Sequence, residues 1–206
     1  FAHNPEPLPQ HLVDIAQMMQ KGGFDVGFVV DPDVDRLAIL NEDGSMFGEE
    51  YTLVAVSDYI LQHKKGNTVS NLSSTRALRD VSNGYGVSYN ASAVGEVNVV
   101  EKMKATNAII GGEGNGGVIY PELHYGRDAL VGIALFLTFM AKSGKKCSEI
   151  RSQYPAYTIS KNKIELQPNM NVPEIMQKMA TKYADYEVNT IDGVKIDFPG
   201  WLGTPS

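Results

Sequence analysis

The stretch Val26-Gly27-Phe28-Val29-Val30-Asp31-Pro32-Asp33-Val34-Asp35-Arg36 joins a short apolar run to a cluster of acids. The apolar run predicts a buried strand over 26–30, so the aspartates follow the end of that strand and enter a tight loop. Carboxylates at positions i, i+2 and i+4 point the same way along an extended chain and converge when the chain curls. The sequence therefore places three negative charges close together at the end of a strand.

These three charges repel one another unless a cation compensates them, and carboxylate oxygens suit a hard divalent ion. Asp31, Asp33 and Asp35 are therefore predicted to bind Mg²⁺. An EF-hand calcium loop is a second interpretation, because Glu42 stands at the twelfth position from Asp31. That pattern requires glycine at its sixth position and a helix in front, whereas this chain has Arg36 and a strand. A solvated acidic turn is the third interpretation.

A second motif is the glycine-rich segment Gly111-Gly112-Glu113-Gly114-Asn115-Gly116-Gly117. Glycines permit positive φ angles and a close approach of the backbone to a ligand. Glu113 and Asn115 then supply one charged acceptor and one group that both donates and accepts, which suits neighbouring sugar hydroxyls. The alternative is a tight turn that only connects two strands.

Other polar residues admit a structural and a functional interpretation. Arg36 could hold a phosphate oxygen, a fourth carboxylate or a surface salt bridge. Residues 74–76, Ser-Thr-Arg, open a predicted helix, where backbone N–H groups favour an anion, but simple capping is the preferred interpretation. Asp128 is predicted to be the N-cap of the helix that follows it. The histidines show no metal-ligand spacing and receive no role.

Together the two motifs resemble those of the α-D-phosphohexomutase family. Asp31–Arg36 resembles the family's metal loop D-G-D-x-D-R, with Pro32 in place of glycine. Gly112–Gly117 resembles its sugar-binding loop G-E-x-S-G-H, with Asn115 and Gly117 in place of serine and histidine. The resemblance covers nearly the whole chain, from His3 to Phe198. It implies an enzyme that moves a phosphoryl group between the 1- and 6-positions of a hexose phosphate through an enzyme phosphoserine and a bisphosphorylated intermediate.

The resemblance also implies roles for individual residues. Arg36 is expected to be catalytic, Mg²⁺ to bind the aspartates, and Glu113 and Asn115 to bind the substrate. Glu96 stands where some members have a histidine near the sugar, so it is expected to bind substrate or transfer a proton; at a helix start it could instead only complement the helix dipole. Because Glu113 lies outside the aspartate loop, its loss is expected to leave metal affinity unchanged.

Two motifs of the family are absent from these residues. No segment resembles the phosphoserine loop, T-A-S-H-N or similar, and the sequence stops where the phosphate loop R-P-S-x-T-E-P is expected. The chain therefore resembles a middle fragment that binds without turnover. Its expected partners are a hexose phosphate and the remaining domains of the parent chain, with a hexose 1,6-bisphosphate as activator. A non-catalytic module that binds sugar phosphate or metal on the same scaffold is the alternative function.

From residue 49 onward, predicted helices alternate with short apolar strands. Helices are expected over 51–64, 75–81, 97–104 and 129–142, and strands over 68–72, 87–90, 108–111 and 118–120. This alternation predicts an α/β fold with a mixed, mostly parallel sheet and helices on both faces. Before it come a helix over 8–20 and strands over 26–30 and 37–40; after it come strands over 158–166, 187–190 and 194–198 and a helix over 172–183. The expected domains are the end of domain 2 (1–45), domain 3 (46–156) and the start of domain 4 (157–206).

Composition limits the class of protein. A chain of 206 residues with 43% hydrophobic and 20% charged residues is ordinary for a globular protein, and its net charge of −6 argues against a general nucleic-acid surface. The longest apolar run, Ala129–Ala141, is shorter than the ~20 residues of a membrane span. With Cys147 as the single cysteine, no internal disulfide can form. No membrane association is expected, and a cytoplasmic location is the natural prediction.

Overall fold

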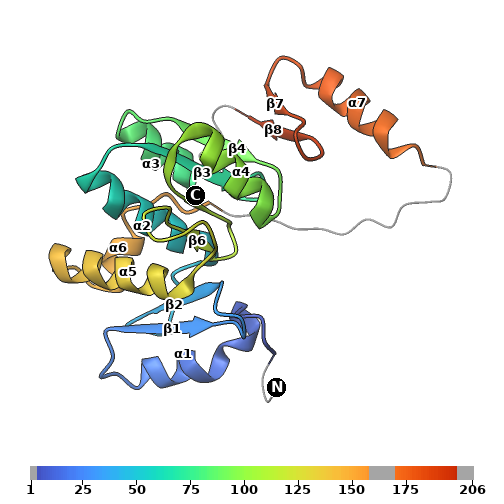
Figure 1. Ribbon diagram of the computed structural model, residues 1–206. Coiled ribbons are helices and arrows are strands. Elements are labelled where there is room, and N and C mark those ends of the chain that lie inside the picture. Colours follow the sequence, from blue (N-terminus) through green and yellow to red (C-terminus); the bar gives the residue numbers. More distant parts are fainter. Residues whose placement is uncertain (1–3, 158–169, 199–206) are drawn as a thin grey trace. The chain divides into compact units, whose positions relative to one another are not determined.

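The computed structural model describes residues 4–157 and 170–198, and the chain divides into two compact units, residues 1–158 and 159–206. Figure 1 shows the helices and strands of both units. The strand expected over 158–166 lies outside the described residues.

The first unit begins with a helix and a two-stranded antiparallel sheet. The elements are a 3₁₀ turn Pro9–His11, α1 (Val13–Gln20), β1 (Val26–Val30) and β2 (Leu37–Asn41). Sequence periodicity predicted one helix from residue 8. The α-helix starts only at residue 13, because Leu12 leaves helical geometry with φ −108° and ψ 19°. Val30 pairs with Leu37 at the end of the ladder, so the aspartates lie in the loop that connects the two strands.

The larger sheet has the strand order β4-β3-β5-β6. Its strands are β3 (Asn67–Asn71), β4 (Tyr89–Ser92), β5 (Ala108–Gly112) and β6 (Val118–Ile119). β3 is parallel to both β4 and β5, whereas β6 is antiparallel to β5. This arrangement confirms the prediction of a mixed, mostly parallel sheet.

Helices cover both faces of this sheet, as expected (Figure 1). They are α2 (Glu49–His63), α3 (Ala77–Gly84), α4 (Glu96–Thr106) and α5 (Ala129–Ser143), and the short α6 (Cys147–Arg151) packs against α2 and β2. On one face, Val99 and Met103 of α4 pack against Val69. On the other, α2 and α3 share a core with Ile110 of β5. The sequence did not predict α6, because five residues are too short to show a helical period.

The core extends from the larger sheet to the β1–β2 hairpin. Leu37 and Ile39 of β2 belong to the same buried cluster as α2 and α5. Phe136 of α5 makes edge contacts with Phe28 and with Phe47, whose ring centroids lie 6.3 and 5.0 Å away. This packing holds the aspartate loop against the α/β domain.

The second unit contains α7 (Val172–Lys182), β7 (Glu187–Asn189) and β8 (Lys195–Asp197), and the two strands are antiparallel. The rings of Tyr183, Tyr186 and Phe198 pack together. These elements agree with the helix and the last two strands expected from the sequence. In the part of the chain that the structure covers, no helix has the length and hydropathy needed to cross a membrane.

Candidate functional site

The aspartate loop curls as predicted and brings its three carboxylates together. Asp31, Asp33 and Asp35 each offer an oxygen, and these oxygens lie within 4.8 Å of one another. The Val34 N–H donates to the Asp31 carbonyl at 3.0 Å, and Val34 itself has φ 60°, which is costly for a β-branched residue. Asp31 Oδ1 accepts the backbone N–H groups of Asp35 and Arg36, both at 3.0 Å. These bonds fix the carboxylate of Asp31 inside the loop.

The pKa values of Asp31 and Asp35 are shifted in opposite directions. Burial opposes ionisation of Asp31, but the N–H groups of Arg36 and Asp35 outweigh it, so the Asp31 pKa is lowered. The Asp35 pKa is raised to about 6: burial is the largest cause, the charge of Arg127 opposes it, and Asp31 and Asp33 add to it. A bound cation would favour the ionised forms of all three.

The donor set fits a hard divalent ion. Asp35 Oδ1 is buried and makes no hydrogen bond to any described residue. Asp31, Asp33 and Arg36 also line a cavity of about 400 Å³. A strand, β1, precedes the loop, so the EF-hand interpretation does not apply. Asp31 is only 6% exposed and Asp35 is half-buried, unlike residues of a solvated acidic turn, whereas Asp33 is exposed.

Arg36 lies at the edge of this cluster. Its Nε is 3.4 Å from Asp31 Oδ2 and 3.8 Å from Asp35 Oδ1, and its Nη1 is 3.4 Å from Glu6 Oε1. The side chain is one-third exposed. It therefore neutralises the loop in part and still faces solvent.

The glycine-rich loop contacts the residue that directly follows the aspartate loop, and the start of α5 contacts the aspartate loop itself. The Leu37 N–H, at the start of β2, donates to the Gly116 carbonyl at 3.3 Å, and the Ala129 N–H donates to the Val34 carbonyl at 3.0 Å. Gly116 has φ +88°, and a Cβ added there would lie 2.3 Å from the Leu37 carbonyl oxygen. Glycine is therefore required at position 116 both by its backbone conformation and by this close approach.

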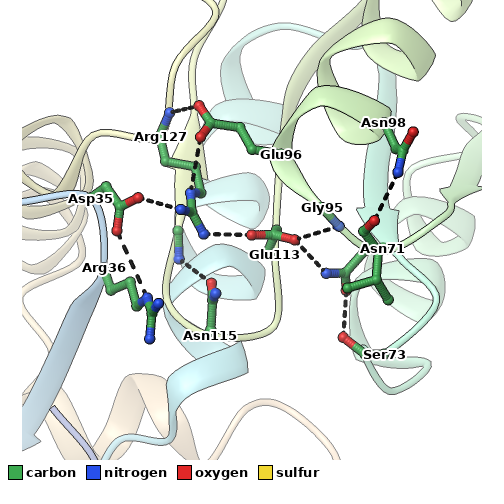
Figure 2. A network of polar contacts seen from close by, with 12 residues as sticks. Asp35, Arg36, Asn71, Ser73, Gly95, Glu96, Asn98, Glu113, Asn115 and Arg127 are labelled. Atoms are coloured by element: carbon green, nitrogen blue, oxygen red, sulfur yellow. Dashed lines mark hydrogen bonds and ion pairs between the residues drawn. The ribbon is translucent and has the colours of Figure 1, made fainter. Parts of the chain in front are cut away.

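Glu113 points into the site and is already well bonded (Figure 2). Its Oε1 accepts from Asn71 Nδ2 at 2.8 Å and from the Gly95 N–H at 3.1 Å, and its Oε2 accepts from Arg127 Nη1 at 2.5 Å. Each carboxylate oxygen has two lone pairs, so Oε2 retains one. The Glu113 carboxylate thus already accepts three hydrogen bonds. Its side chain belongs to a residue that is only 5% exposed, which the sequence did not indicate. Asn115 Oδ1 accepts the Gly117 N–H at 3.2 Å, inside the same loop.

Arg127 lies at the centre of the network, and sequence reasoning gave it no role. Its Nη2 is paired with Asp35 Oδ2, its Nη1 with Glu113, and its Nε lies 3.4 Å from Glu96 Oε2. The backbone N–H of Arg127 also donates to Glu96 Oε1 at 3.0 Å. Carboxylates from three segments of the chain thus meet one guanidinium (Figure 2). The sequence signal that could have pointed to Arg127 was its position just before Asp128. The predicted N-cap role of Asp128 is confirmed, since its side chain accepts the Val131 N–H at 3.1 Å.

Residues 73–76 support the site from one side. The Thr75 N–H donates to Glu50 Oε1 at 2.8 Å, and Thr75 Oγ1 accepts the Ala77 N–H at 3.1 Å where α3 begins. The N-cap residue of α3 is Arg76, whose side chain makes no capping bond, so the bond from the Ala77 N–H goes to the residue before the N-cap. Ser73 and Ser74 donate their hydroxyls to Asn71 Oδ1, both at 3.0 Å. These bonds orient the Asn71 amide toward Glu113.

Two sequence profiles match the chain. Residues 48–157 match the α/β/α domain III of phosphoglucomutase/phosphomannomutase, and residues 1–44 match domain II of the same enzymes. The chain belongs to the phosphoglucomutase/phosphomannomutase family. Membership confirms the resemblance that the two motifs predicted.

Individual members of the family resemble this chain over nearly all of its length. The phosphoglucomutase/phosphomannomutase of Thermococcus kodakarensis is 32% identical over 205 residues, 98% of this chain and 44% of that protein. The probable phosphoglucosamine mutase of Methanopyrus kandleri is 27% identical over 96% of this chain and 44% of that protein. A crystal structure of a phosphoglucomutase/phosphomannomutase family protein from Burkholderia thailandensis superposes with a TM-score of 0.80 at 26% identity and covers 96% of this chain and 43% of that one. The chain thus spans a little under half the length of these phosphohexomutase relatives.

Proposed function

We propose that the chain is part of a phosphomutase that moves a phosphoryl group between the 1- and 6-positions of a hexose phosphate through an enzyme phosphoserine. The observation that carries this proposal is the junction of the aspartate loop with the glycine-rich loop: Gly116 accepts from Leu37, the residue after the aspartates, and Arg127 pairs with both Asp35 and Glu113. Phosphoryl transfer needs charge neutralisation and a precisely oriented acceptor hydroxyl. The two loops supply the groups for both.

Each site residue has a role in this proposal. Asp31, Asp33 and Asp35 would hold Mg²⁺, which supplies positive charge to the transferred phosphoryl group when bound. Arg36, at the exposed edge of the cluster, would contact a phosphate oxygen. Glu113, through the remaining lone pair of Oε2, and Asn115 would orient sugar hydroxyls. Glu96 is 36% exposed and bonded to Arg127, so we assign it to substrate binding at the edge of the site.

The domain assignment is also a proposal: residues 1–45 as the end of domain 2, 46–156 as domain 3 and 157–206 as the start of domain 4. On this division the phosphoserine and the distal phosphate loop come from other parts of the parent protein. The 206 residues alone are then expected to bind metal and hexose phosphate without turnover. Hexose 1,6-bisphosphate would activate the complete enzyme, and a cytoplasmic location remains the prediction from sequence.

Metal binding is tested by thermal unfolding with and without Mg²⁺ or Mn²⁺. A ligand at one hundred times its dissociation constant stabilises the folded state by about 2.7 kcal/mol. Asp33→Ala should abolish this shift and leave the melting temperature without metal unchanged or higher, since one of three like charges is removed. Glu42→Ala is the matched control, because Glu42 bonds Ser148 instead of the cluster, so the metal-dependent shift should persist. A shift lost equally in both variants would reject the assignment of the aspartates.

The catalytic proposal is tested on the complete natural protein with glucose, mannose and glucosamine 1-phosphates, in a coupled assay with catalytic hexose 1,6-bisphosphate. Turnover that requires Mg²⁺ and is lost in Asp35→Ala supports a mutase. Binding of sugar phosphate with no turnover on any of the three would favour the alternative, a non-catalytic module on the same scaffold.

A further inference from the structure

In the sequence, the aspartate loop and the glycine-rich loop are separate motifs. In the structure, one side chain joins them. The guanidinium of Arg127 pairs with Asp35 through Nη2 and with Glu113 through Nη1, and its side chain is only 14% exposed. A guanidinium holds its donors in a rigid plane, so two carboxylates bound to it cannot move independently. The folded protein therefore holds the carboxylates of Asp35 and Glu113 at fixed positions relative to each other.

We propose that Arg127 is the shared counter-ion of the two loops and couples metal affinity to sugar-phosphate affinity. This inference rests on the proposed function, since it assumes that Asp35 is a metal ligand and that Glu113 orients the sugar. Arg127 occupies Asp35 Oδ2, while Oδ1 makes no hydrogen bond within the described chain. The arginine can thus stay on Asp35 while Oδ1 faces a cation, but its positive charge opposes that cation.

Glu113 moderates this opposition because it shares the same guanidinium. The carboxylate of Glu113 balances part of the positive charge of Arg127, so less of that charge acts near Asp35. Neutralising Glu113 would leave only Asp35 and Glu96 to balance Arg127 and would weaken metal binding, although Glu113 is not a metal ligand. This result differs from the sequence expectation that Glu113 has no effect on metal affinity.

The glycine at position 117 creates the space for this arrangement. A Cβ added at Gly117 would lie 2.5 Å from Arg127 Cδ and 3.2 Å from Arg127 Cγ. The Arg127 side chain therefore passes over the backbone at a position where any larger residue would displace it. No left-handed φ is required at Gly117, so an alanine there moves the arginine without changing the charge. Its Cβ would also lie 3.2 Å from Asn115 Oδ1.

The test uses the complete natural protein, with Mn²⁺ affinity measured by electron paramagnetic resonance and glucose 1-phosphate affinity measured by calorimetry in the presence of chelator. Arg127→Gln should tighten Mn²⁺ binding by about tenfold, because a nearby positive charge is removed, and weaken glucose 1-phosphate binding by about tenfold. Opposite changes at two sites cannot come from general damage to the fold, which would weaken both. Arg127→Lys, which keeps the charge but loses the fork, and Gly117→Ala should each give smaller changes in the same directions.

The coupling itself is measured by a double-mutant cycle on Mn²⁺ affinity. Glu113→Gln should weaken Mn²⁺ binding by about threefold or more when Arg127 is present and by much less in the Arg127→Gln background. Arg151→Gln is the control, because Arg151 bonds the Phe47 carbonyl away from the site, so both affinities should stay unchanged. If Arg127→Gln changes both affinities in the same direction, or changes neither affinity, the counter-ion role is overturned. If the unaltered protein binds neither ligand, the proposed function fails, and this inference fails with it.

Discussion

Replacing Gly116 by alanine should break the junction between the two loops. Gly116 has φ +88°, and an added Cβ would lie 2.3 Å from the Leu37 carbonyl oxygen and 3.0 Å from Leu37 N. A left-handed backbone costs an L-residue about 1–2 kcal/mol. Relieving a clash in a packed interior costs about 1–3 kcal/mol more. The free energy of unfolding of the first unit should therefore fall by about 2–5 kcal/mol.

The assay is urea unfolding followed by far-UV circular dichroism, which reports α2, α4 and α5 of the first unit. With a denaturant slope of about 2 kcal/mol/M, the midpoint should fall by about 1–2.5 M. Gly84→Ala is the matched control, because Gly84 ends α3, has no left-handed φ and would place its Cβ in open space. That variant should be about 0.4–1 kcal/mol more stable. A Gly116→Ala midpoint within about 0.2 M of the unaltered protein would refute the close contact of Gly116 with Leu37.

Two further predictions concern titratable groups, the half-buried Tyr85 and the buried Cys147. Burial raises the Tyr85 pKa to about 12, and its bond to Asp58 and the charge of Asp58 add to the shift. Between pH 10 and 12 the folded state keeps a proton that the unfolded state loses, so this contribution to stability is present below pH 10 and disappears as the pH rises toward 12. Urea midpoints measured across this range should therefore fall less steeply in Tyr85→Phe. Burial, with the charges of Glu42 and Asp43, also raises the Cys147 pKa to about 12. The thiol should therefore resist disulfide reagents at pH 8 and react promptly in denaturant. Rapid reaction of the native protein would contradict the buried position of Cys147 in α6.

Most elements of the fold could be predicted from local sequence. Hydrophobic periods placed β1, β2, α2 and α5 within one or two residues of their observed bounds. Local signals succeeded because each of these segments has a period or a capping residue of its own, such as Asp128 before α5. They failed at α6, which is too short for a period, and at the start of α1, where the geometry of Leu12 delays the helix.

The sequence by itself determined the two motifs, because the aspartates are neighbours along the chain and the glycines form one continuous segment. Their spacing was sufficient to predict a cation site and a backbone that approaches a ligand. The family resemblance also followed from these residues alone.

Only the tertiary structure decided how the motifs are joined. Arg127 lies 92 residues from Asp35 and 14 from Glu113 in the sequence, and it meets both because β6 and the start of α5 bring its backbone to the edge of the aspartate loop. The same packing determines how many lone pairs of the Glu113 carboxylate remain open to a ligand. It also leaves no space for a Cβ at position 117, beside the Arg127 side chain. Local pattern cannot encode these facts, since the charge balance of a buried carboxylate depends on which groups the fold places around it.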